Sequence, residues 1–424
     1  MRAKRTAARG SRESGNLGDP GKPALSHRRV ALPVPPPDDH PVRVIVIGGG
    51  IAGLSAAIAL RRTGNEAVVL ERASRVDPVG AGITLFANAM RALDRLGVGE
   101  AVAARGAAAT RSAILTSDGR ELTRVPSDLL EGTIALHRAD LQAELAAASG
   151  DVRLGVEVTA VEQGEDGVVA RSTDGREERA DLLVGADGLS SVVRRAIADV
   201  PIRYAGYTAW RGVSSVPVEA GRLTESWGVG ERFGLVDIGR GRTYWFATKN
   251  APEGEPDEPG GRKAEIRRRF SGWHEPIAAV VEAADEGAIL RNDVYYLEPL
   301  LRWSGGRVVL VGDAAHATTP GVGQGAAQAI EDAVVLADRL VRRDELATAL
   351  AEYETIRRPR AEAVLKMSRR VDSRPARQPA RVASQERRRP AAARPRPAPP
   401  ARAARPLRAV ASPLLDAQRW SSVS

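Results

Sequence analysis

The most informative stretch of the chain is VRVIVIGGGIAGLSAAIALRRTGNEAVVLER, residues 42–72. Its opening VRVIVI is mostly apolar and β-branched, which is typical of a strand buried on both faces. A glycine-rich turn follows, and LSAAIALRRTG has the composition of a helix that ends at Gly64. EAVVLER is a second apolar strand. The stretch therefore predicts a strand, a tight turn, a helix and a second strand within about 30 residues.

The turn carries three glycines with the spacing Gly48-x-Gly50-x-x-Gly53. The first permits the tight turn, the second lets the backbone approach a pyrophosphate, and the third lets the helix pack against the strand. Free N–H groups at the helix start then face the phosphates. Glu71 ends the second strand, where its carboxylate can accept ribose hydroxyls and would repel a 2′-phosphate. We therefore predict a Rossmann-type site for FAD or NAD, with Arg72 as either a further nucleotide contact or an ordinary surface charge.

A second strand-to-helix turn lies in ADLLVGADGLSSVVRR, residues 180–195. Asp187 and Gly188 occupy the turn, and Ser190 or Ser191 can cap the helix that follows. This turn again offers N–H groups to a ligand. The alternative is that Asp187 is only a turn residue.

A third turn follows the apolar strand that ends in VGDAAH, residues 311–316. Asp313 is placed to accept a sugar hydroxyl. The glycine run around Gly323 and Gly325 then opens a helix, whose N-terminal dipole would stabilise negative charge on a reduced flavin. We expect His316 to be a packed histidine at the strand end and not a catalyst.

In this order and spacing, the three motifs resemble those of the FAD-dependent aromatic hydroxylases, the class A flavoprotein monooxygenases with the p-hydroxybenzoate hydroxylase fold. The resemblance covers about residues 42–370. It implies an α/β fold, with a Rossmann-type FAD-binding domain of βαβ units and mixed sheet, and a mostly antiparallel β-sheet substrate domain. It also implies that FAD is held by Gly48, Gly50, Gly53, Glu71, Arg72, Arg138, Val158, Asp187, Gly188, Asp313, Gly323, Gln324, Gly325 and Ala326.

The resemblance implies the reaction as well. NADH or NADPH would reduce FAD, O2 would add at flavin C4a, and the resulting hydroperoxide would transfer one oxygen to a small aromatic or anionic organic substrate. An FAD-dependent epoxidase or a prenyl-chain reductase is an alternative on the same scaffold. A non-catalytic binding module is an alternative of another class, although intact Asp187 and Asp313 argue for bound flavin.

Substrate contacts are expected from the aromatic-rich strands of residues 203–250. Arg211 could pair with an anionic substrate, and Arg232 could bind a carboxylate or enolate through two hydrogen bonds. Tyr244 could hydrogen-bond a phenolate. Aromatic and arginine side chains on a half-exposed sheet can equally be packing and surface residues. Pro320 is expected to line the pocket, and the resemblance suggests that Gly321 stands where urate-hydroxylating members carry an acid, which weakens urate as the substrate.

The same patterns suggest an organisation in four parts. Residues 1–40 are predicted to be a disordered extension, and residues 371–424 a disordered or out-of-frame tail. Residues 41–200 and 291–370 are predicted to form the FAD-binding domain, with some substrate-domain strands near 110–130. Residues 201–290 are predicted to form the substrate domain.

Composition limits the other possibilities. The chain has no cysteine and five scattered histidines, so we expect no disulfide and no metal site. Residues 1–40 hold eight basic and four acidic side chains and residues 371–424 hold twelve and three, so the segment between them has a net charge of −4 out of the total of +9. We therefore expect no nucleic-acid binding by the folded core, although the basic ends leave a nucleic-acid binder as an alternative. No apolar run is long enough for a membrane span or a secretory signal, which favours a cytoplasmic protein. The sequence does not indicate an oligomeric state.

Overall fold

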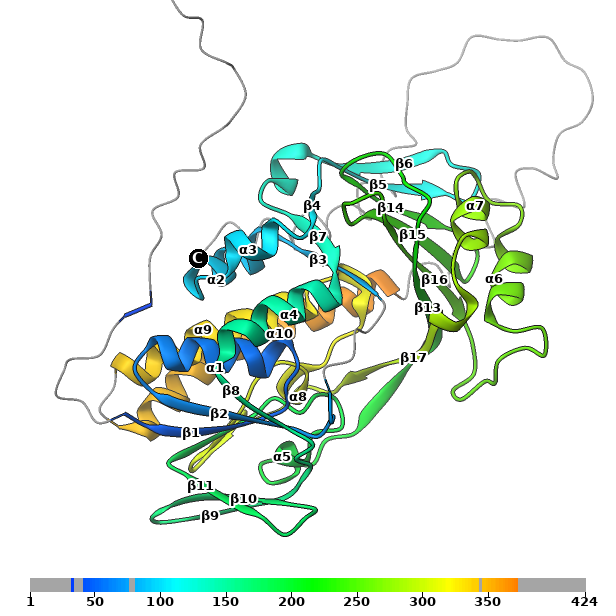
Figure 1. Cartoon of the computed structure of the whole chain (residues 1–424). Coiled ribbons are helices and arrows are strands. Elements are labelled where there is room, and N and C mark those ends of the chain that lie inside the picture. Colours follow the sequence, from blue (N-terminus) through cyan, green and yellow to red (C-terminus); the bar gives the residue numbers. More distant parts are fainter. Residues whose placement is uncertain (1–31, 34–40, 76–80, 343–344, 373–424) are drawn as a thin grey trace, which may run out of the picture. The chain divides into compact units, whose positions relative to one another are not determined.

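The computed structural model describes residues 32–33, 41–75, 81–342 and 345–372. The predictions for the N-terminal extension and the C-terminal tail fall almost wholly outside these residues. The described chain is an α/β structure with one largely parallel sheet and one mostly antiparallel sheet (Figure 1), so the predicted fold class is confirmed. No helix among the described residues is long and apolar enough to cross a membrane.

A six-stranded sheet forms the centre of the first part, in the order β18-β19-β12-β1-β2-β8. Its strands are β1 (Arg43–Ile47), β2 (Glu66–Glu71), β8 (Asp151–Leu154), β12 (Leu182–Gly185), β18 (Ser304–Gly305) and β19 (Val308–Leu310). All neighbouring pairs are parallel except β18 with β19. Because the carboxyl ends of parallel strands meet at one edge, the turns that follow β1, β12 and β19 lie side by side. These are the three turns that carry the predicted motifs.

Helices pack on this sheet and on one another. Helix α1 contacts α9 and α4, and α9 also contacts α2 and α10. Their bounds are α1 (Ile51–Arg62), α2 (Ala87–Arg95), α4 (Arg138–Ser149), α9 (Gly325–Arg342) and α10 (Leu346–Asp372). Strand β1 is buried on both faces beneath these helices, which explains its unbroken apolar run.

Smaller elements complete this part. Two three-stranded sheets have the orders β11-β10-β9 and β3-β7-β4. Their strands are β3 (Gly82–Leu85), β4 (Ala107–Ala108), β7 (Ile134–His137), β9 (Val158–Gly164), β10 (Gly167–Ser172) and β11 (Glu177–Ala180). The short helices are α3 (Gly99–Ala103), α5 (Val192–Arg195), α8 (Asp313–His316), η1 (Ser127–Leu130), η2 (Glu286–Ala288) and η3 (Pro320–Val322).

The mostly antiparallel sheet has seven strands in the order β17-β13-β16-β15-β14-β5-β6. They are β5 (Arg111–Thr116), β6 (Glu121–Val125), β13 (Ile202–Ser214), β14 (Arg222–Trp227), β15 (Glu231–Asp237), β16 (Thr243–Asn250) and β17 (Leu290–Leu297). Strands β5 and β6 come from an earlier part of the chain than the others, and β5 joins the sheet by parallel pairing with β14. We call this sheet the substrate sheet.

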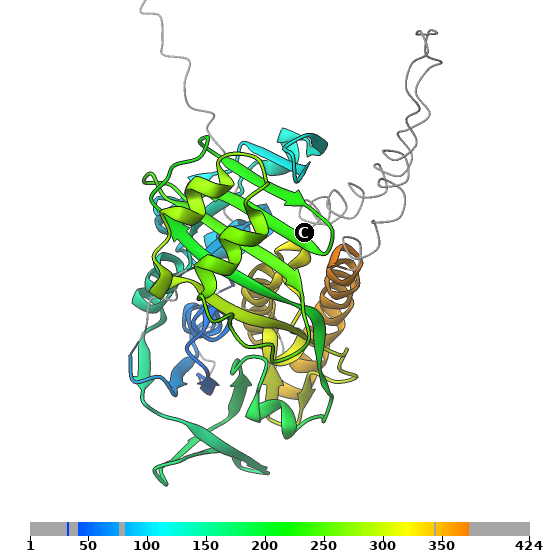
Figure 2. The same cartoon turned by 90° about the vertical axis from the view of Figure 1, so that its right-hand side faces the viewer.

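Alternation along the strands gives the substrate sheet two different faces. The outer face carries Trp210, Phe233 and Trp245, which form a core with Phe270 and Ile277. Those two residues belong to α6 (Arg262–Phe270) and α7 (Ile277–Glu282), the helices that cross the sheet in Figure 2. The opposite side, here called the inner face, carries the alternate residues of the same strands.

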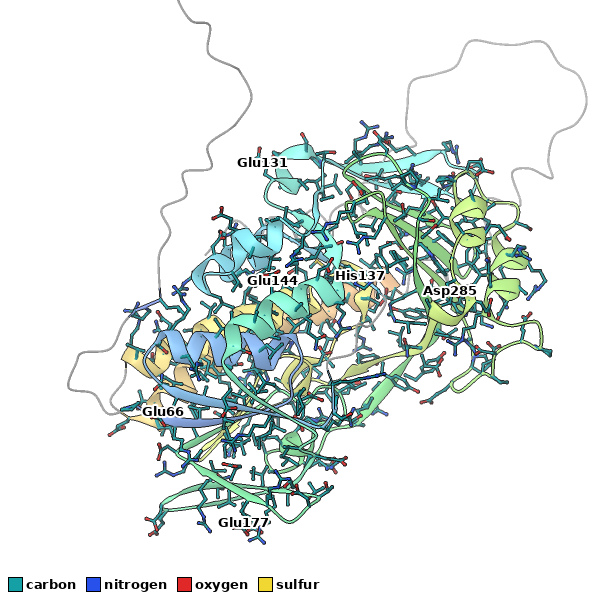
Figure 3. The ribbon with its side chains drawn as sticks, in the orientation of Figure 1. Glu66, Glu131, His137, Glu144, Glu177 and Asp285 are labelled. Atoms are coloured by element: carbon teal, nitrogen blue, oxygen red, sulfur yellow. The ribbon has the colours of Figure 1, made fainter. Side chains whose placement is uncertain are left out.

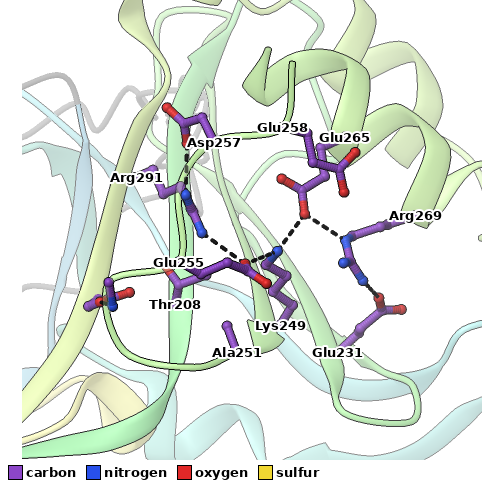
Figure 4. A network of polar contacts seen from close by, with 12 residues as sticks. Thr208, Glu231, Lys249, Ala251, Glu255, Asp257, Glu258, Glu265, Arg269 and Arg291 are labelled. Atoms are coloured by element: carbon purple, nitrogen blue, oxygen red, sulfur yellow. Dashed lines mark hydrogen bonds and ion pairs between the residues drawn. The ribbon is translucent and has the colours of Figure 1, made fainter. Parts of the chain in front are cut away.

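Ion pairs tie α6 and the loop before it to the outer face (Figure 4). The ammonium of Lys249, which is buried, lies 2.6 Å from Glu265 and also pairs with Glu255. Arg269 joins Glu265 at 2.9 Å to Glu231 at 3.0 Å. The basic sequence of α6 is therefore partly neutralised within the chain.

Candidate active site

The glycine turn after β1 has the geometry of a nucleotide site. Gly48 has a φ of +106°, and a Cβ placed on it would lie 2.5 Å from the carbonyl oxygen of Ala186. A Cβ on Gly53 would lie 1.9 Å from the carbonyl oxygen of Gly48, whereas a Cβ on Gly50 would meet nothing within 4 Å. Two glycines are therefore required by packing inside the protein. The third faces open space at the start of α1, as expected where a pyrophosphate approaches the backbone.

Glu71 is held beside this turn. One carboxylate oxygen accepts the N–H of Gly49 at 2.5 Å, and the other accepts the N–H of Ala73 at 2.8 Å. The carboxylate is thus fixed at the end of β2, and Arg72 follows on the exposed surface. Val158 is buried at the start of β9, so only its backbone is suited to a ligand contact.

Asp187 has a visible structural role. Its carboxylate accepts the hydroxyl of Ser191 at 2.5 Å and the N–H groups of Val192 at 2.6 Å and Val193 at 3.2 Å, so it caps the first turn of α5. Gly188 follows with a φ of +76° and open space where a Cβ would stand. A contact from this turn to a nucleotide stays a prediction.

Asp313 lies exposed at the start of α8, directly after the central sheet. Burial nevertheless raises the pKa of its carboxyl, while His316 and Arg138 act to lower it. The side chain is thus open to solvent although protein surrounds its base, and we call this position the recess of Asp313. Asp313 is therefore placed to accept a hydroxyl from a ligand that fills this recess.

Arg138 begins α4 at the border between the central sheet and the substrate sheet. The imidazole of His137 accepts the N–H of Ala139 at 3.2 Å and caps the helix, and Figure 3 labels His137 at the end of α4 nearest the substrate sheet. Gln142, one helical turn further on, donates to the carbonyl oxygen of Gly49 at 3.2 Å. This contact anchors α4 on the glycine turn and was not predicted, although the four-residue spacing from Arg138 is the signal that could have revealed it.

In the loop that leads into α9, the backbone is exposed to solvent and the side chain of Gln324 is buried. Gly323 is exposed with a φ of +66°, and Gly325 and Ala326 are partly exposed. The side chain of Gln324 is turned inward, 3% exposed, and accepts a hydrogen bond from Asn88 at 2.9 Å. The backbone of this loop is thus the part available to a flat ring.

A buried ion network joins α9 and α10 to the turn that follows β19. Asp332 of α9 accepts the N–H of Gly312 at 2.9 Å and lies 2.6 Å from the imidazole of His316. The guanidinium of Arg357 in α10 lies 2.7 Å from Asp332 and 2.5 Å from Glu331. His316 therefore has a structural partner. Asp332 and Arg357 were not predicted, because their pairing joins two helices that the sequence does not place together.

Two predicted substrate residues come together on the inner face of the substrate sheet. Tyr244 pairs with Val213 across β16 and β13, so Arg211 stands two residues away on the same face. The guanidinium of Arg211 donates to the side-chain oxygen of Asn292 at 3.4 Å, and burial raises the pKa of Tyr244 while Arg211 and Arg138 act to lower it. The ring of Tyr244 lies against Gly82, where a Cβ would be only 2.3 Å from the ring carbon Cγ. Gly82 pairs with His137, the residue before Arg138, so Tyr244 lies close to the start of α4.

Arg232, the third predicted substrate residue, lies on the same face, two strands away from Arg211. It is 5% exposed, and its guanidinium lies 2.9 Å from Asp372 and 3.2 Å from Glu225. It also lies over the ring of Tyr207 at 5.5 Å. The charge of Arg232 is thus compensated within the chain, and a role of Arg211 or Tyr244 in binding an anion stays a prediction.

The position next to Pro320 is closed to any side chain. A Cβ on Gly321 would lie 2.6 Å from a carboxylate oxygen of Asp372 and 2.8 Å from the carbonyl oxygen of Ser368. Pro320 itself is exposed at the start of η3. The glycine at 321 is therefore required by the approach of α10, and the acid nearest to this position is Asp372.

Comparison with known proteins shows the family to which the chain belongs. Residues 41–368 match the family model described as the FAD binding domain, so the chain belongs to this family. It is 47% identical over 328 residues to the aurachin C monooxygenase/isomerase of Stigmatella aurantiaca, covering 75% of this chain and 85% of that protein. It is 36% identical over 337 residues to the 2-heptyl-3-hydroxy-4(1H)-quinolone synthase of Pseudomonas aeruginosa, covering 77% of this chain and 87% of that protein.

The crystal structure of Klebsiella pneumoniae HpxO complexed with FAD and uric acid superposes with a TM-score of 0.76 and 30% identity, covering 88% of this chain and 97% of that one. These findings confirm the predicted resemblance to the FAD-dependent hydroxylases. The glycine turn, Glu71 and the recess of Asp313 fit FAD, and the protein is an FAD-binding oxidoreductase of the monooxygenase type.

Proposed function

We propose that the protein is a monooxygenase that uses NADH or NADPH and O2 to hydroxylate a small aromatic or heteroaromatic substrate bearing an anionic oxygen. The observation that carries this proposal is the pair of Arg211 and Tyr244 on the inner face, close to Arg138 at the start of α4. A cationic and a phenolic donor next to the flavin motifs suit an enolate or phenolate, the electron-rich form that accepts oxygen.

In this proposal, the residues of the protein bind FAD and orient the substrate. The open glycine turn at Gly50 would receive the pyrophosphate, Glu71 the adenosine ribose, and Asp313 a hydroxyl of the ribityl chain. Bound FAD would supply the electron transfer and oxygen activation that no side chain of the protein provides. Arg211 and Tyr244 would hold the substrate's oxygen and stabilise its negative charge.

Two relatives suggest what kind of ring the site takes. One is named for a 4(1H)-quinolone, and the structure of another holds uric acid. Gly321 has no room for a side chain, and Asp372 nearby is occupied by Arg232, so the acid expected of urate hydroxylases is not free here. We therefore favour a quinolone-like or phenolic ring over urate.

The test begins with the visible spectrum of the purified protein. A flavin band close to stoichiometric with protein is expected, and a colourless folded protein would contradict the proposal. The rate of NADH or NADPH oxidation is then measured with 4-hydroxyquinoline, 4-hydroxybenzoate and urate, and at least one of these compounds should increase it. The product should gain one oxygen atom from labelled O2; stimulated peroxide release without oxygenated product would contradict hydroxylation.

A further inference from the structure

We propose that Glu225 is a second substrate-binding group, and that the substrate carries an N–H or O–H donor across its ring from the oxygen that Arg211 holds. The inference rests on the proposed function, because it concerns the same inner face. It names a chemical class, the planar heteroaromatic with an acceptor oxygen at one end and a donor at the other.

Strand register places the two groups in one row. Glu225 of β14 pairs with Gly234 of β15, which pairs with Phe246 of β16, which pairs with Arg211 of β13. Residues directly opposite one another on neighbouring strands point to the same face. A carboxylate and a guanidinium therefore stand at the two ends of a row that crosses the inner face.

An aromatic ring lies between them. A Cβ on Gly234 would be 1.9 Å from the ring of Phe246, so this ring lies directly over the glycine. Phe246 is partly exposed, and its ring is 6.1 Å from that of Tyr244, tilted by 38°. The middle of the row is thus an apolar platform on which a planar ring can stack.

The distance suits a small ring system. Three strand spacings of about 4.8 Å separate the backbones of Glu225 and Arg211 by about 14 Å. Both side chains occupy part of that length, and what remains along the row at Phe246 compares with the length of one or two fused rings. An oxygen on the ring can then meet Arg211 while a donor at the other end meets Glu225.

One carboxylate oxygen of Glu225 can accept a hydrogen bond from a ligand. The indole N–H of Trp227 donates to Oε1 at 2.8 Å, and Arg232 donates to the same oxygen at 3.2 Å. Within the described part of the chain, no hydrogen bond is formed by Oε2, and the side chain is 22% exposed. Arg232 and Trp227 therefore orient the carboxylate through Oε1, and Oε2 has no donor among the described residues.

The experiment compares two ligands that differ only in the donor. Binding of 4(1H)-quinolone and of its N-methyl derivative to the FAD-loaded protein is measured by isothermal titration calorimetry without NADH or NADPH. The wild type should bind the N–H compound at least about tenfold more tightly, the usual worth of a hydrogen bond to a charged group. In Glu225→Gln this ratio should fall to within about threefold.

Glu231→Gln is the matched control. Glu231 is 23% exposed and pairs with Arg269 at 3.0 Å, but its side chain lies on the outer face of the neighbouring strand. This variant should keep the wild-type ratio. A wild type that binds both compounds equally, or neither, overturns the inference even if Glu225→Gln does not fold.

A folded Glu225→Gln that keeps the full preference overturns it as well. Failure of the proposed function is recognised separately, by the absence of bound flavin or of oxygenated product. Calorimetry does not depend on turnover, so the two failures are distinguishable.

Discussion

The guanidinium of Arg232 in β15 lies 2.9 Å from the carboxylate of Asp372, in the last turn of α10. Both side chains are nearly buried, and the hydroxyl of Tyr207 donates to the same carboxylate at 3.1 Å. The substrate sheet is thereby bonded to the helix that packs on the loop of Pro320 and Val322. A contact that spans 140 residues of sequence therefore joins the inner face to the helix that packs on η3.

Gly50 and Gly53 should respond differently to alanine. Gly50→Ala places a methyl group in open space at a backbone angle that alanine adopts, so the fold should keep its stability while FAD affinity falls by about tenfold or more. Gly53→Ala forces a methyl group against the carbonyl oxygen of Gly48 and should destabilise the protein by about 1–3 kcal/mol. Urea unfolding of the flavin-free protein and FAD titration separate the two effects.

Equal losses of stability in both variants would show that Gly50 is also required by packing. Full FAD affinity in Gly50→Ala would show that the pyrophosphate does not approach there.

Arg357→Met should be strongly destabilising. It leaves the buried carboxylate of Asp332 without its arginine partner, which costs about 3–5 kcal/mol. Arg358→Ala on the same helix is the control, because Arg358 is 37% exposed and its loss should cost about 1 kcal/mol or less. Urea unfolding measures both, and similar losses would contradict the importance of the buried network.

Arg211→Gln should weaken binding of an anionic substrate by about tenfold to a hundredfold, because a charged hydrogen bond is lost. Tyr244→Phe should have a smaller effect, since it removes a single neutral donor. FAD content should stay at the wild-type level in both, because neither residue belongs to the glycine turn or the recess of Asp313. The change is measured as KM or Kd, and an unchanged value for Arg211→Gln would remove it from the site.

The preference for a ligand with an N–H donor should depend on pH. Burial raises the pKa of the Glu225 carboxyl above its ordinary value, although Arg232 and the N–H of Trp227 act to lower it, and Asp372 raises it further. As the pH falls through that raised pKa, the carboxylate is protonated and its free oxygen becomes a poorer acceptor. The ratio of affinities for 4(1H)-quinolone and its N-methyl derivative should therefore be largest at high pH and decline as the pH is lowered. Glu225→Gln should show no such decline.

Local patterns in the sequence predict the parts of the fold that neighbouring residues determine. The glycine turn, the apolar strands and the helices that follow glycine turns are of this kind. One helix was expected to end at Gly64 and another to open in the glycine run at 323–325, and α1 (Ile51–Arg62) and α9 (Gly325–Arg342) are found there. A turn or helix is specified by residues within one or two turns of one another, so a single sequence contains the whole signal.

Pairings between distant segments are not predictable in this way. The sequence predicts that Arg232 contacts the substrate, because it does not show that Asp372 and Glu225 pair with this arginine in the fold. Glu225 gains its interest only from the register of four strands, which a one-residue shift would turn to the other face. Asp332 and Arg357 carry no motif, since their roles come from the packing of α9 against α10.

The strand order of the central sheet also determines when the protein can acquire its flavin during synthesis. Strand β1 pairs with β12, and β12 with β19, while α1 packs against α9. The glycine turn near residue 50 is thus completed by elements that leave the ribosome some 260 to 290 residues later. Such a long separation makes folding of this site slow and late. Flavin should therefore bind only after α9 has been synthesised. Nascent chains that stop before α9 should remain without cofactor and be susceptible to proteolysis.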